Sequence, residues 1–429
     1  MVFTGTTYKK INTAQVLDVD KVRKDFPILA RRVNGRPLIY LDNAATCQKP
    51  RAVVKRIVDF YTRNNSNIHR GVHALSERAS GEFEAARETV RQFLNARSTR
   101  EIVFTQGTTD AINLVADSFG ADFLSKGDEI IVSGMEHHSN VLPWQRICAR
   151  RQAALKVLPC EHNGRLRVED LDRLITENTK LIALVYVSNV LGVRNPVEEV
   201  IRRARARGVP VLLDGAQAVA HFEVDVRALD CDFFAFSGHK LYADTGIGVL
   251  YGKEQWLRIL PPYRTGGGMV QSVGPERVRY AGLPLKFEAG TMHVAGALSL
   301  EEAIHYLRKL GFDSVRAHQR RLMDYAEGRL RALDGVTVYA SPSRRYGAVS
   351  FTIDGVHPYD AGLILDKLGI AVRSGTHCAE PLMRKYGVGG MVRASFALYN
   401  TRDEVDALIE GIRRVQELCG ECKSTRSLQ

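Results

Sequence analysis

A lysine at the end of an apolar run is the first residue of this sequence that could do chemistry. The run Phe234-Ala-Phe-Ser-Gly-His239-Lys240 precedes a second apolar run at residues 245–251, so Lys240 is expected in a turn between buried strands. An ammonium group is costly to bury unless it is paired, neutral or covalently bonded. A lysine whose pKa is lowered by burial is the residue type that forms Schiff bases with aldehydes. A lysine taken alone is more often a surface residue at a strand end.

A carboxylate at the end of another apolar run suits the same chemistry. Asp214 ends residues 210–214, and Gln217 follows three positions later. A carboxylate at a buried strand end needs a cationic partner. A protonated pyridine nitrogen would serve, and a protonated pyridine ring is the electron sink that carbanion chemistry requires.

Donors for a phosphate group follow two further runs. Thr108 and Thr109 come after residues 102–105 and open a predicted helix, where free backbone N–H groups bind anions. Ser237 and His239 lie beside Lys240. A Gly-Thr-Thr sequence alone is also ordinary helix capping. Schiff-base lysine, carboxylate and phosphate donors together indicate pyridoxal phosphate as the cofactor.

A cysteine provides a candidate nucleophile. Cys378 lies in Arg373-Ser-Gly-Thr-His377-Cys378, and the arginine and histidine beside it favour the thiolate, which is the reactive form. A lone cysteine is otherwise a small buried hydrophobe. Arg393 can clamp a substrate carboxylate through two hydrogen bonds, or it can serve a structural ion pair.

Two more polar groups follow predicted strands. His137 and His138 come after residues 129–133, and Asn189 follows residues 181–187, where its amide is placed for polar contact. Paired histidines suggest a metal, but no companion with ligand spacing accompanies them, so no metal site is predicted. An imidazole could instead stack on a flat cofactor and shuttle protons near neutral pH.

These groups need a scaffold that brings strand ends together. From about residue 80 to 250, apolar strands alternate with amphipathic helices, which predicts an α/β fold with a mostly parallel sheet covered on both faces. Functional residues in such sheets collect outside the carboxyl ends of the strands. Helices are expected at residues 168–175, at residues 298–310 as a link between two domains, and after the capping-box spacing of residues 401–404.

Composition limits the class of protein. The chain has 429 residues, ordinary hydrophobic (45%) and charged (25%) content, and no apolar run long enough to span a membrane. The net charge of +12 raises the question of nucleic acid, but no nucleic-acid-binding motif accompanies it, so an acidic partner protein is at least as plausible. Seven scattered cysteines and no visible secretory signal favour a reducing cytoplasm.

With these residues identified, the chain resembles the SufS-like (group II) cysteine desulfurases of the class V aminotransferase superfamily. The resemblance runs from about residue 26 to 414. Its most specific stretches are Tyr40-Leu-Asp-Asn-Ala-Ala45, Asn67-Ile-His-Arg-Gly-Val-His73, Phe104-Thr-Gln-Gly-Thr-Thr109, Met135-Glu-His-His138, Asp214-Gly-Ala-Gln217, Ser237-Gly-His-Lys240, Phe287-Glu-Ala-Gly-Thr291 and Arg373-Ser-Gly-Thr-His-Cys378.

The resemblance implies a homodimer with the fold-type I, aspartate-aminotransferase-like architecture. Residues 37–305 would form a large cofactor domain, and residues 1–36 and 306–429 would form a smaller α/β domain. Within the site, Lys240 would hold the cofactor as a Schiff base and shuttle protons. The implied cofactor contacts are Asp214 to the ring nitrogen, Gln217 to the ring hydroxyl, His137 stacked on the ring, and Thr108, Thr109, Ser237, His239 and, from the second subunit, Thr291 to the phosphate.

The implied reaction converts L-cysteine to L-alanine and leaves a persulfide on Cys378. The sulfur then passes to an acceptor protein for iron–sulfur cluster assembly. Substrate binding is assigned by the same resemblance to Arg393, Asn189, His69 and Arg373. A selenocysteine lyase on the same scaffold is the alternative enzyme. A scaffold that only activates a partner enzyme would lack Lys240, Asp214 or Cys378, and all three are present.

The chain departs from the family pattern at three places. Thr376 stands where many SufS-like members have histidine or glutamine, and Ala243-Asp244 replaces a commoner Gly-Pro after the lysine. The segment at His357 lacks the second histidine of relatives that feed a zinc-containing scaffold protein. A SufE-like acceptor is therefore favoured over a SufU-like one.

Overall fold

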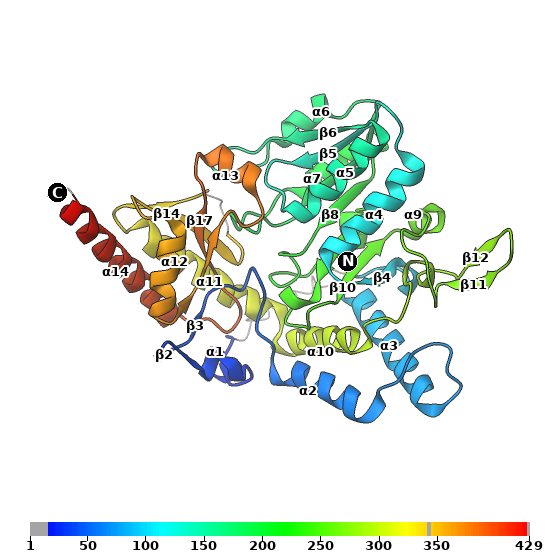
Figure 1. Cartoon of the computed structure of the whole chain (residues 1–429), viewed down its shortest axis with the longest axis horizontal. Coiled ribbons are helices and arrows are strands. Elements are labelled where there is room, and N and C mark those ends of the chain that lie inside the picture. Colours follow the sequence, from blue (N-terminus) through cyan, green and yellow to red (C-terminus); the bar gives the residue numbers. More distant parts are fainter. Residues whose placement is uncertain (1–15, 341–344, 427–429) are drawn as a thin grey trace, which may run out of the picture.

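The computed structural model describes residues 16–340 and 345–426 (Figure 1). Residues 1–15 and 427–429 of the predicted small domain lie outside the described residues. The largest element is a seven-stranded sheet in the order β4-β10-β9-β8-β7-β5-β6. Its strands are β4 (Ile102–Thr105), β5 (Glu129–Ser133), β6 (Ala154–Leu158), β7 (Thr179–Val185), β8 (Val211–Asp214), β9 (Phe233–Ser237) and β10 (Gly248–Gly252).

The sheet is mostly parallel, as the alternation of strands and helices predicted. All pairs from β9 to β6 are parallel, and only β10 runs antiparallel to its two neighbours, β4 and β9. The parallel strands therefore end at one edge. Asp214 closes β8 and Ser237 closes β9 at that edge, which brings the two side chains to the same region.

Both faces of this sheet are buried against helices. Strand β4 shows this, since its successive side chains point to opposite faces and pack in two different hydrophobic clusters. Val103 packs with residues of three helices, whereas its neighbours Ile102 and Phe104 pack with those of three others. The first group is α4 (Thr108–Phe123), α5 (Leu142–Arg151) and α9 (Glu254–Ile259); the second is α3 (Ala74–Phe93), α7 (Val197–Arg205) and α10 (Val294–Leu310).

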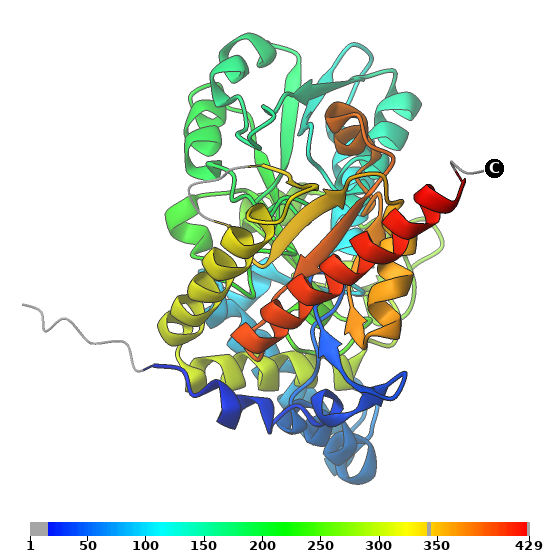
Figure 2. The same cartoon turned by 90° about the vertical axis from the view of Figure 1, so that its left-hand side faces the viewer.

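A second, antiparallel sheet has the order β13-β14-β17-β16. Its strands are β13 (Val336–Val338), β14 (Ala348–Ile353), β16 (Arg373–Gly375) and β17 (Met391–Ser395). It is covered by α11 (Phe312–Arg331), α12 (Pro358–Lys367) and α14 (Arg402–Arg426), as Figure 2 shows. The predicted capping box at the start of α14 is confirmed, because the Glu404 N–H donates to Thr401 Oγ1 (3.3 Å) and the Thr401 N–H donates to Glu404 Oε2 (3.1 Å).

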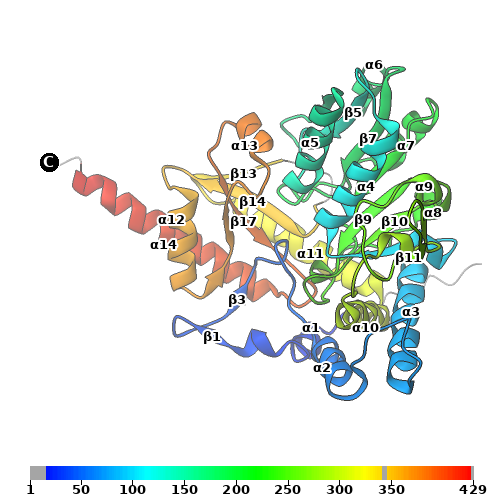
Figure 3. The same ribbon diagram turned by 45° about the vertical axis from the view of Figure 1, so that its right-hand side comes forward.

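The two sheets are joined by a long helical connection. Only Gly311 separates α10 from α11, so the chain passes directly from one sheet to the other (Figure 3). The linking helix predicted at residues 298–310 is confirmed and begins earlier, at Val294. The predicted boundaries at residues 36 and 305 stay predictions. The short strand β3 (Ile39–Tyr40), just after the first boundary, pairs in parallel with β15 (Ile370–Ala371).

Two expectations differ from the structure. The helix predicted over residues 168–175 is only a 3-10 turn, η5 (Val168–Asp170), followed by α6 (Leu171–Leu174), because the Thr176 N–H bonds to Thr179 Oγ1 (2.9 Å) and turns the chain. Strand β6 was not predicted. It lies at the sheet edge and carries a half-exposed Lys156, so its sequence lacks a continuous apolar run.

The remaining elements are short. They are α1 (Val19–Arg23), β1 (Arg32–Val33), β2 (Arg36–Pro37), α2 (Arg51–Asp59), the π-helical turn η2 (Phe60–Asn64), α8 (Val226–Leu229), β11 (Val270–Val273), β12 (Val278–Tyr280) and α13 (Glu380–Tyr386). Further single 3-10 turns are η1 (Pro27–Ala30), η3 (Thr99–Glu101), η4 (His138–Asn140), η6 (Gly238–Lys240) and η7 (Leu285–Phe287). Among the helices described, none combines the length and apolarity that crossing a bilayer requires.

Candidate active site

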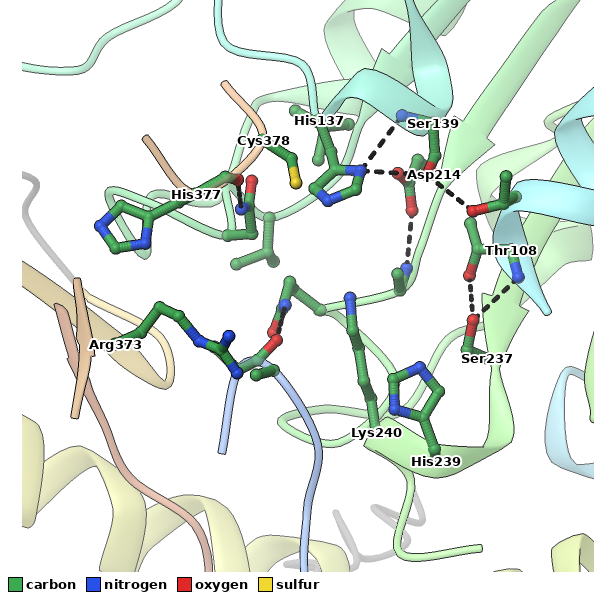
Figure 4. Close-up of a pocket in the computed structure, with 18 of the residues that line it drawn as sticks. Thr108, His137, Ser139, Asp214, Ser237, His239, Lys240, Arg373, His377 and Cys378 are labelled. Atoms are coloured by element: carbon green, nitrogen blue, oxygen red, sulfur yellow. Dashed lines mark hydrogen bonds between the residues drawn. The ribbon is translucent and has the colours of Figure 1, made fainter. Parts of the chain in front are cut away.

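A cavity of about 300 Å³ lies between the carboxyl edge of the seven-stranded sheet and the loop that follows β16 (Figure 4). Every site residue predicted from the sequence lines it, except His69 and Thr291. The predicted residues that meet there are Thr108, Thr109, His137, Asn189, Asp214, Gln217, Ser237, His239, Lys240, Arg373, Cys378 and Arg393. Residues far apart in the chain, such as Ala44 and Arg393, thus line one cavity.

Lys240 lies in the turn η6 between β9 and β10, as predicted. Its side chain points into the cavity (Figure 4). Burial lowers the pKa of the Lys240 amine, and the nearby Asp214 carboxylate opposes that shift. A lowered pKa enlarges the fraction of neutral amine, which is the form that can attack a carbonyl carbon.

Asp214 is 3% exposed and faces the same cavity. Its Oδ1 accepts a hydrogen bond from the Ala216 N–H (2.9 Å). Burial raises the pKa of the Asp214 carboxyl, whereas Lys240 acts in the opposite direction. Gln217 is fixed by a hydrogen bond from its Nε2 to the Ala44 carbonyl (2.8 Å), which leaves its Oε1 as an acceptor.

The start of α4 carries a cluster of hydroxyl groups. Ser237 Oγ accepts from the Thr108 N–H (2.8 Å) and lies 2.7 Å from Thr108 Oγ1. Thr109 Oγ1 lies 2.7 Å from Ser139 Oγ. A helix N-terminus with free N–H groups and converging hydroxyls is a suitable site for a phosphate.

His137 is held by the turn that it begins. The Ser139 N–H donates to His137 Nδ1 (3.1 Å), so Nδ1 is the acceptor and the proton of the neutral ring is on Nε2. Burial lowers the pKa of His137 to about 4, so the ring is neutral at pH 7. His239 on the other side of the cavity is likewise neutral, because burial lowers its pKa to about 4.

Cys378 is exposed and lies in a loop with an uncommon backbone. His377 and Cys378 have φ angles of 54° and 55°, in the left-handed region that residues other than glycine seldom adopt. Two hydrogen bonds from the large sheet's loops hold them. The His138 N–H donates to the Cys378 carbonyl (2.8 Å), and Asn189 Nδ2 donates to the His377 carbonyl (2.9 Å). Strained backbone persists where its surroundings hold it, and such positions cluster at functional sites.

Two of the departures from the family pattern are now placed. Thr376 Oγ1 donates to Glu380 Oε1 (2.9 Å), and Glu380 also pairs with the imidazole of His138. Glu380 therefore links the Cys378 loop to η4. At the other departure, the Asp244 N–H donates to Ser299 Oγ (3.0 Å) and anchors the segment after Lys240 to α10.

The two arginines differ in their surroundings. Arg373 is half exposed and pairs with Asp42 (2.7 Å). Arg393 is 3% exposed, and it donates to the Asn189 carbonyl (3.0 Å) and to Asp42 (3.4 Å). Burial lowers the pKa of Arg393 to about 10. Its Nε has no hydrogen-bond partner among the described residues, and neither has Asn189 Oδ1.

One inference from the sequence is wrong. His377 was expected to favour the Cys378 thiolate, but its ring is buried away from the cysteine and lies 3.1 Å from the Met391 carbonyl through Nε2 (Figure 4). Burial lowers the pKa of His377 to about 3, so the ring carries no positive charge at neutral pH. The ring lies against the carbonyl of Met391 in β17, a contact that sequence proximity could not reveal.

His69 and Thr291 lie outside the cavity. The His69 ring packs against the edge of Phe83, with centroids 5.9 Å apart, and Thr291 is exposed. Their assigned roles stay predictions, since Thr291 was expected to act from a second subunit. Residues that the sequence reasoning missed are Ser139, Asp42 and Glu380. Asp42 stands within a quoted motif and Ser139 directly follows one, whereas Glu380 is identified only by its contacts.

Cys378 is distinguished from another cysteine near Lys240. Cys47 Sγ lies 3.1 Å from the Lys240 carbonyl, but the thiol is buried. Burial raises the pKa of Cys47 to about 12, so it stays protonated. In the described ranges, no group of three or more His, Cys, Asp or Glu side chains is placed to hold a metal ion.

Comparisons with known proteins agree with this geometry. Residues 39–408 match the family model for class V aminotransferases. A cysteine desulfurase of Serratia proteamaculans is 50% identical over 403 residues, covering 94% of this chain and 99% of the relative. Among solved structures, the cysteine desulfurase CsdA of Escherichia coli has a TM-score of 0.87 at 40% identity, covering 94% of this chain and all of that one. A cysteine desulfurase of Thermococcus onnurineus has a TM-score of 0.88 at 37% identity, covering 94% and 98%. The chain therefore belongs to the class V aminotransferase family and, within it, to the cysteine desulfurases.

Proposed function

We propose that this protein is a pyridoxal-phosphate-dependent cysteine desulfurase that converts L-cysteine to L-alanine and keeps the sulfur as a persulfide on Cys378. The observation that carries the proposal is the meeting of Lys240, Asp214 and Cys378 at one cavity. The first two suit a pyridine aldehyde, and the third supplies a sulfur nucleophile that other class V activities do not need.

The residues present fit pyridoxal phosphate. Asp214 is a buried carboxylate with one hydrogen bond from the chain, and a ring N–H is a suitable second partner. Thr108, Thr109 and Ser237 would hold the phosphate, with His239 beside them, and Gln217 Oε1 would accept from the ring hydroxyl; all five residues line the cavity. When bound, the cofactor supplies an aldehyde that condenses with amines and a ring that takes up electrons from the substrate α-carbon.

The chain's own groups control protons around that ring. Lys240, with its pKa lowered by burial, is the base that takes the proton from the substrate α-carbon. Asp214 would keep the ring nitrogen protonated. His137 is neutral and carries its proton on Nε2, so it would lie beside the ring without adding a competing charge.

The substrate carboxylate is held by buried donors that the fold leaves unused. Arg393 Nε has no hydrogen-bond partner within the described chain, and Asn189 Nδ2 has a second hydrogen beyond the one given to His377. A carboxylate placed between them pairs with a guanidinium in a setting that excludes water. Arg373 adds positive charge from the exposed side.

Cys378 performs the sulfur transfer. Its thiolate attacks the substrate sulfur, an S–S bond forms, and the bond between sulfur and the β-carbon breaks. The electron pair of that bond stays with the carbon skeleton, which takes up a proton and leaves as alanine. The exposure of Cys378 then makes the outer sulfur accessible to an acceptor protein.

We assign the acceptor to the SufE-like class and the downstream use to iron–sulfur cluster assembly. His357, at the start of α12, accepts a hydrogen bond from the Tyr359 N–H (3.3 Å) and has no second histidine beside it for a shared zinc ion. Persulfide chemistry needs a free thiol, so we place the reaction in the reducing cytoplasm. L-selenocysteine, whose selenium can leave by the same route, is a second candidate substrate.

We also propose a homodimer. Val54, Val58 and Tyr61 are exposed and recur at intervals of four and three residues along α2 and η2, so they form an apolar stripe. Val72 and Leu75 add exposed apolar area at the start of α3, in the segment that carries His69. A second subunit on this surface would bring His69 and Thr291 into a shared site.

The function is tested by supplying L-cysteine to the purified holoenzyme. We expect a yellow protein that forms alanine and, with a reductant, an equal amount of sulfide. The Lys240→Ala variant is expected to lose alanine formation. An apoprotein that cannot take up pyridoxal phosphate, or a holoenzyme that forms no alanine from L-cysteine, would contradict the proposal. L-Selenocysteine in the same assay tests the second substrate.

A further inference from the structure

A second cavity, of about 640 Å³, opens beside α11 and shares no lining residue with the cavity around Lys240. One side of α11 forms its wall. The opposite boundary is formed by His221 and by Arg345, Tyr346 and Gly347, which directly precede β14. Nothing in the proposed sulfur chemistry uses it.

Three arginines of α11 line this cavity. Arg316, Arg320 and Arg321 all contribute to the lining, so their positive charges act on the same space. Arg316 pairs with Asp313, which also lines the cavity, and Arg320 lies 3.8 Å from Asp324. No acidic partner of Arg321 is found among the described residues, so the wall keeps a positive excess.

The floor of the cavity is polar and buried. His221 Nδ1 lies 3.2 Å from Gln319 Oε1, and the two residues are 9% and 5% exposed. Gln319 Nε2 is a buried donor with no hydrogen-bond partner in the described part of the chain. Buried donors are normally paired, so this one indicates a missing acceptor. Burial also lowers the pKa of His221, which keeps the ring neutral and able to donate one hydrogen bond.

The glycine at position 347 leaves space for the His221 ring at the floor of the cavity. Gly347 lines the cavity with a φ of +66°, and a β-carbon there would lie 2.2 Å from His221 Nε2. A side chain at position 347 would therefore displace the imidazole. His221 also lies on the segment after β8, which starts directly after Asp214 and carries Gln217, so the floor and the cofactor site share one stretch of chain.

We infer that this second cavity binds a small oxyanion with two negative charges, such as phosphate or a short dicarboxylate. Arg320 and Arg321 supply the charge, and Gln319 Nε2 supplies the directed donor at the floor. The site is independent of the cysteine desulfurase reaction, so its failure would leave the proposed function intact.

The test is calorimetric titration of the holoenzyme with inorganic phosphate and, separately, with succinate. The holoenzyme is required because bound cofactor already fills the phosphate position at α4. The variant Arg320→Ala with Arg321→Ala is expected to weaken binding by about tenfold or more, from the loss of charge-assisted hydrogen bonds. The matched control Arg413→Ala with Arg414→Ala removes two adjacent, similarly exposed arginines from α14 and is expected to leave binding unchanged.

A second variant distinguishes loss of anion binding from loss of the fold. Ala317→Glu places a carboxylate on the same wall at a half-exposed helical position, and it is expected to weaken anion binding while circular dichroism stays unchanged. Binding of phosphate or succinate that both α11 variants weaken supports the site. Absence of binding of either anion, or binding that the α11 variants and the control affect equally, would overturn it.

Discussion

At the scale of single residues, the site is built from groups held away from their usual charge state. Burial lowers the pKa of Lys240, raises that of Asp214 and lowers that of His137 to about 4. Each shift favours the neutral form, because a charge is costly in a poorly hydrated cavity. A cofactor with a protonated ring nitrogen gives Asp214 a cationic partner and removes the cost of its isolated charge.

His377 gives the clearest prediction of pH dependence. Its pKa is lowered from about 6.5 in the unfolded chain to about 3 in the fold, so below pH 6.5 the unfolded state binds more protons. Stability should therefore fall as the pH falls through about 6.5 towards 3. Between about pH 7.5 and 5, this group alone should remove ~2 kcal/mol of unfolding free energy.

The measurement is urea unfolding of wild type and His377→Gln at both pH values. The glutamine amide can still donate to the Met391 carbonyl but does not titrate. The variant should therefore lose less stability on acidification than the wild type does. Equal losses in the two proteins would show that His377 is not buried in the neutral form.

At the scale of elements, the Cys378 loop is fixed by side chains from separate segments. Glu380, the first residue of α13, receives a hydrogen bond from Thr376 and pairs with His138 of η4. The backbone of His138 holds the Cys378 carbonyl as well. The contacts of Glu380 thus restrain the strained backbone that carries the nucleophile.

We expect Glu380→Ala to slow sulfur transfer about tenfold, because a loosened loop places the cysteine less often within reach of the substrate. KM for L-cysteine should stay nearly unchanged, since Arg393 is untouched. Glu380→Gln should recover most of the rate, because its amide oxygen still accepts from Thr376. Steady-state kinetics measure both parameters, with Glu410→Ala, an exposed glutamate of α14, as the control. A Glu380→Ala enzyme as fast as that control would contradict this role.

The approach of α4 to β10 gives a second test at this scale. A β-carbon on Gly248 would lie 2.4 Å from Gly107 Cα, at the start of the phosphate-binding turn. Gly248→Ala should therefore weaken pyridoxal phosphate binding by about tenfold or more, by displacing donors from the phosphate. Gly81→Ala in α3 has nothing within 4 Å and should instead stabilise the fold by ~0.5–1 kcal/mol.

Fluorescence titration of the apoproteins with pyridoxal phosphate, together with urea unfolding, measures both effects. Unchanged cofactor affinity in Gly248→Ala would show that the helix start can move without loss. A destabilised Gly81→Ala would show that the glycine in α3 is needed for packing.

The elements also show what the sequence could predict. Strands β4 and β5 begin and end where expected, because each is a continuous apolar run between polar residues. The edge strand β6 was missed because burial of only part of its side chains leaves no such run. Most site residues could be found because they follow strand ends. The link from Glu380 to His138 could not, because it exists only where two distant loops meet.

At the scale of the whole molecule, the single chain leaves part of the predicted site incomplete. His69 and Thr291 lie outside the cavity, and the apolar stripe of Val54, Val58 and Tyr61 is exposed. We expect light scattering of the holoenzyme to give twice the chain mass of 47.8 kDa. Val58→Glu should shift the mass towards one chain, because a charge in an apolar interface is costly.

Leu142→Glu, at an exposed apolar position on α5, is the matched control and should keep the mass of the dimer. A wild-type holoenzyme with the mass of a single chain would contradict the dimer, and with it the assignment of Thr291 to a partner's cofactor.

The most direct test of the central claim is mass spectrometry of the peptide that carries Cys378 after the holoenzyme has reacted with L-cysteine. The peptide should be heavier by one sulfur atom, and alanine should form in equal amount in a single turnover. In Cys378→Ala, the yellow cofactor band should remain while alanine formation is lost. Alanine production at the wild-type rate by that variant, or added sulfur on another cysteine such as Cys47, would contradict Cys378 as the sulfur acceptor of the reaction.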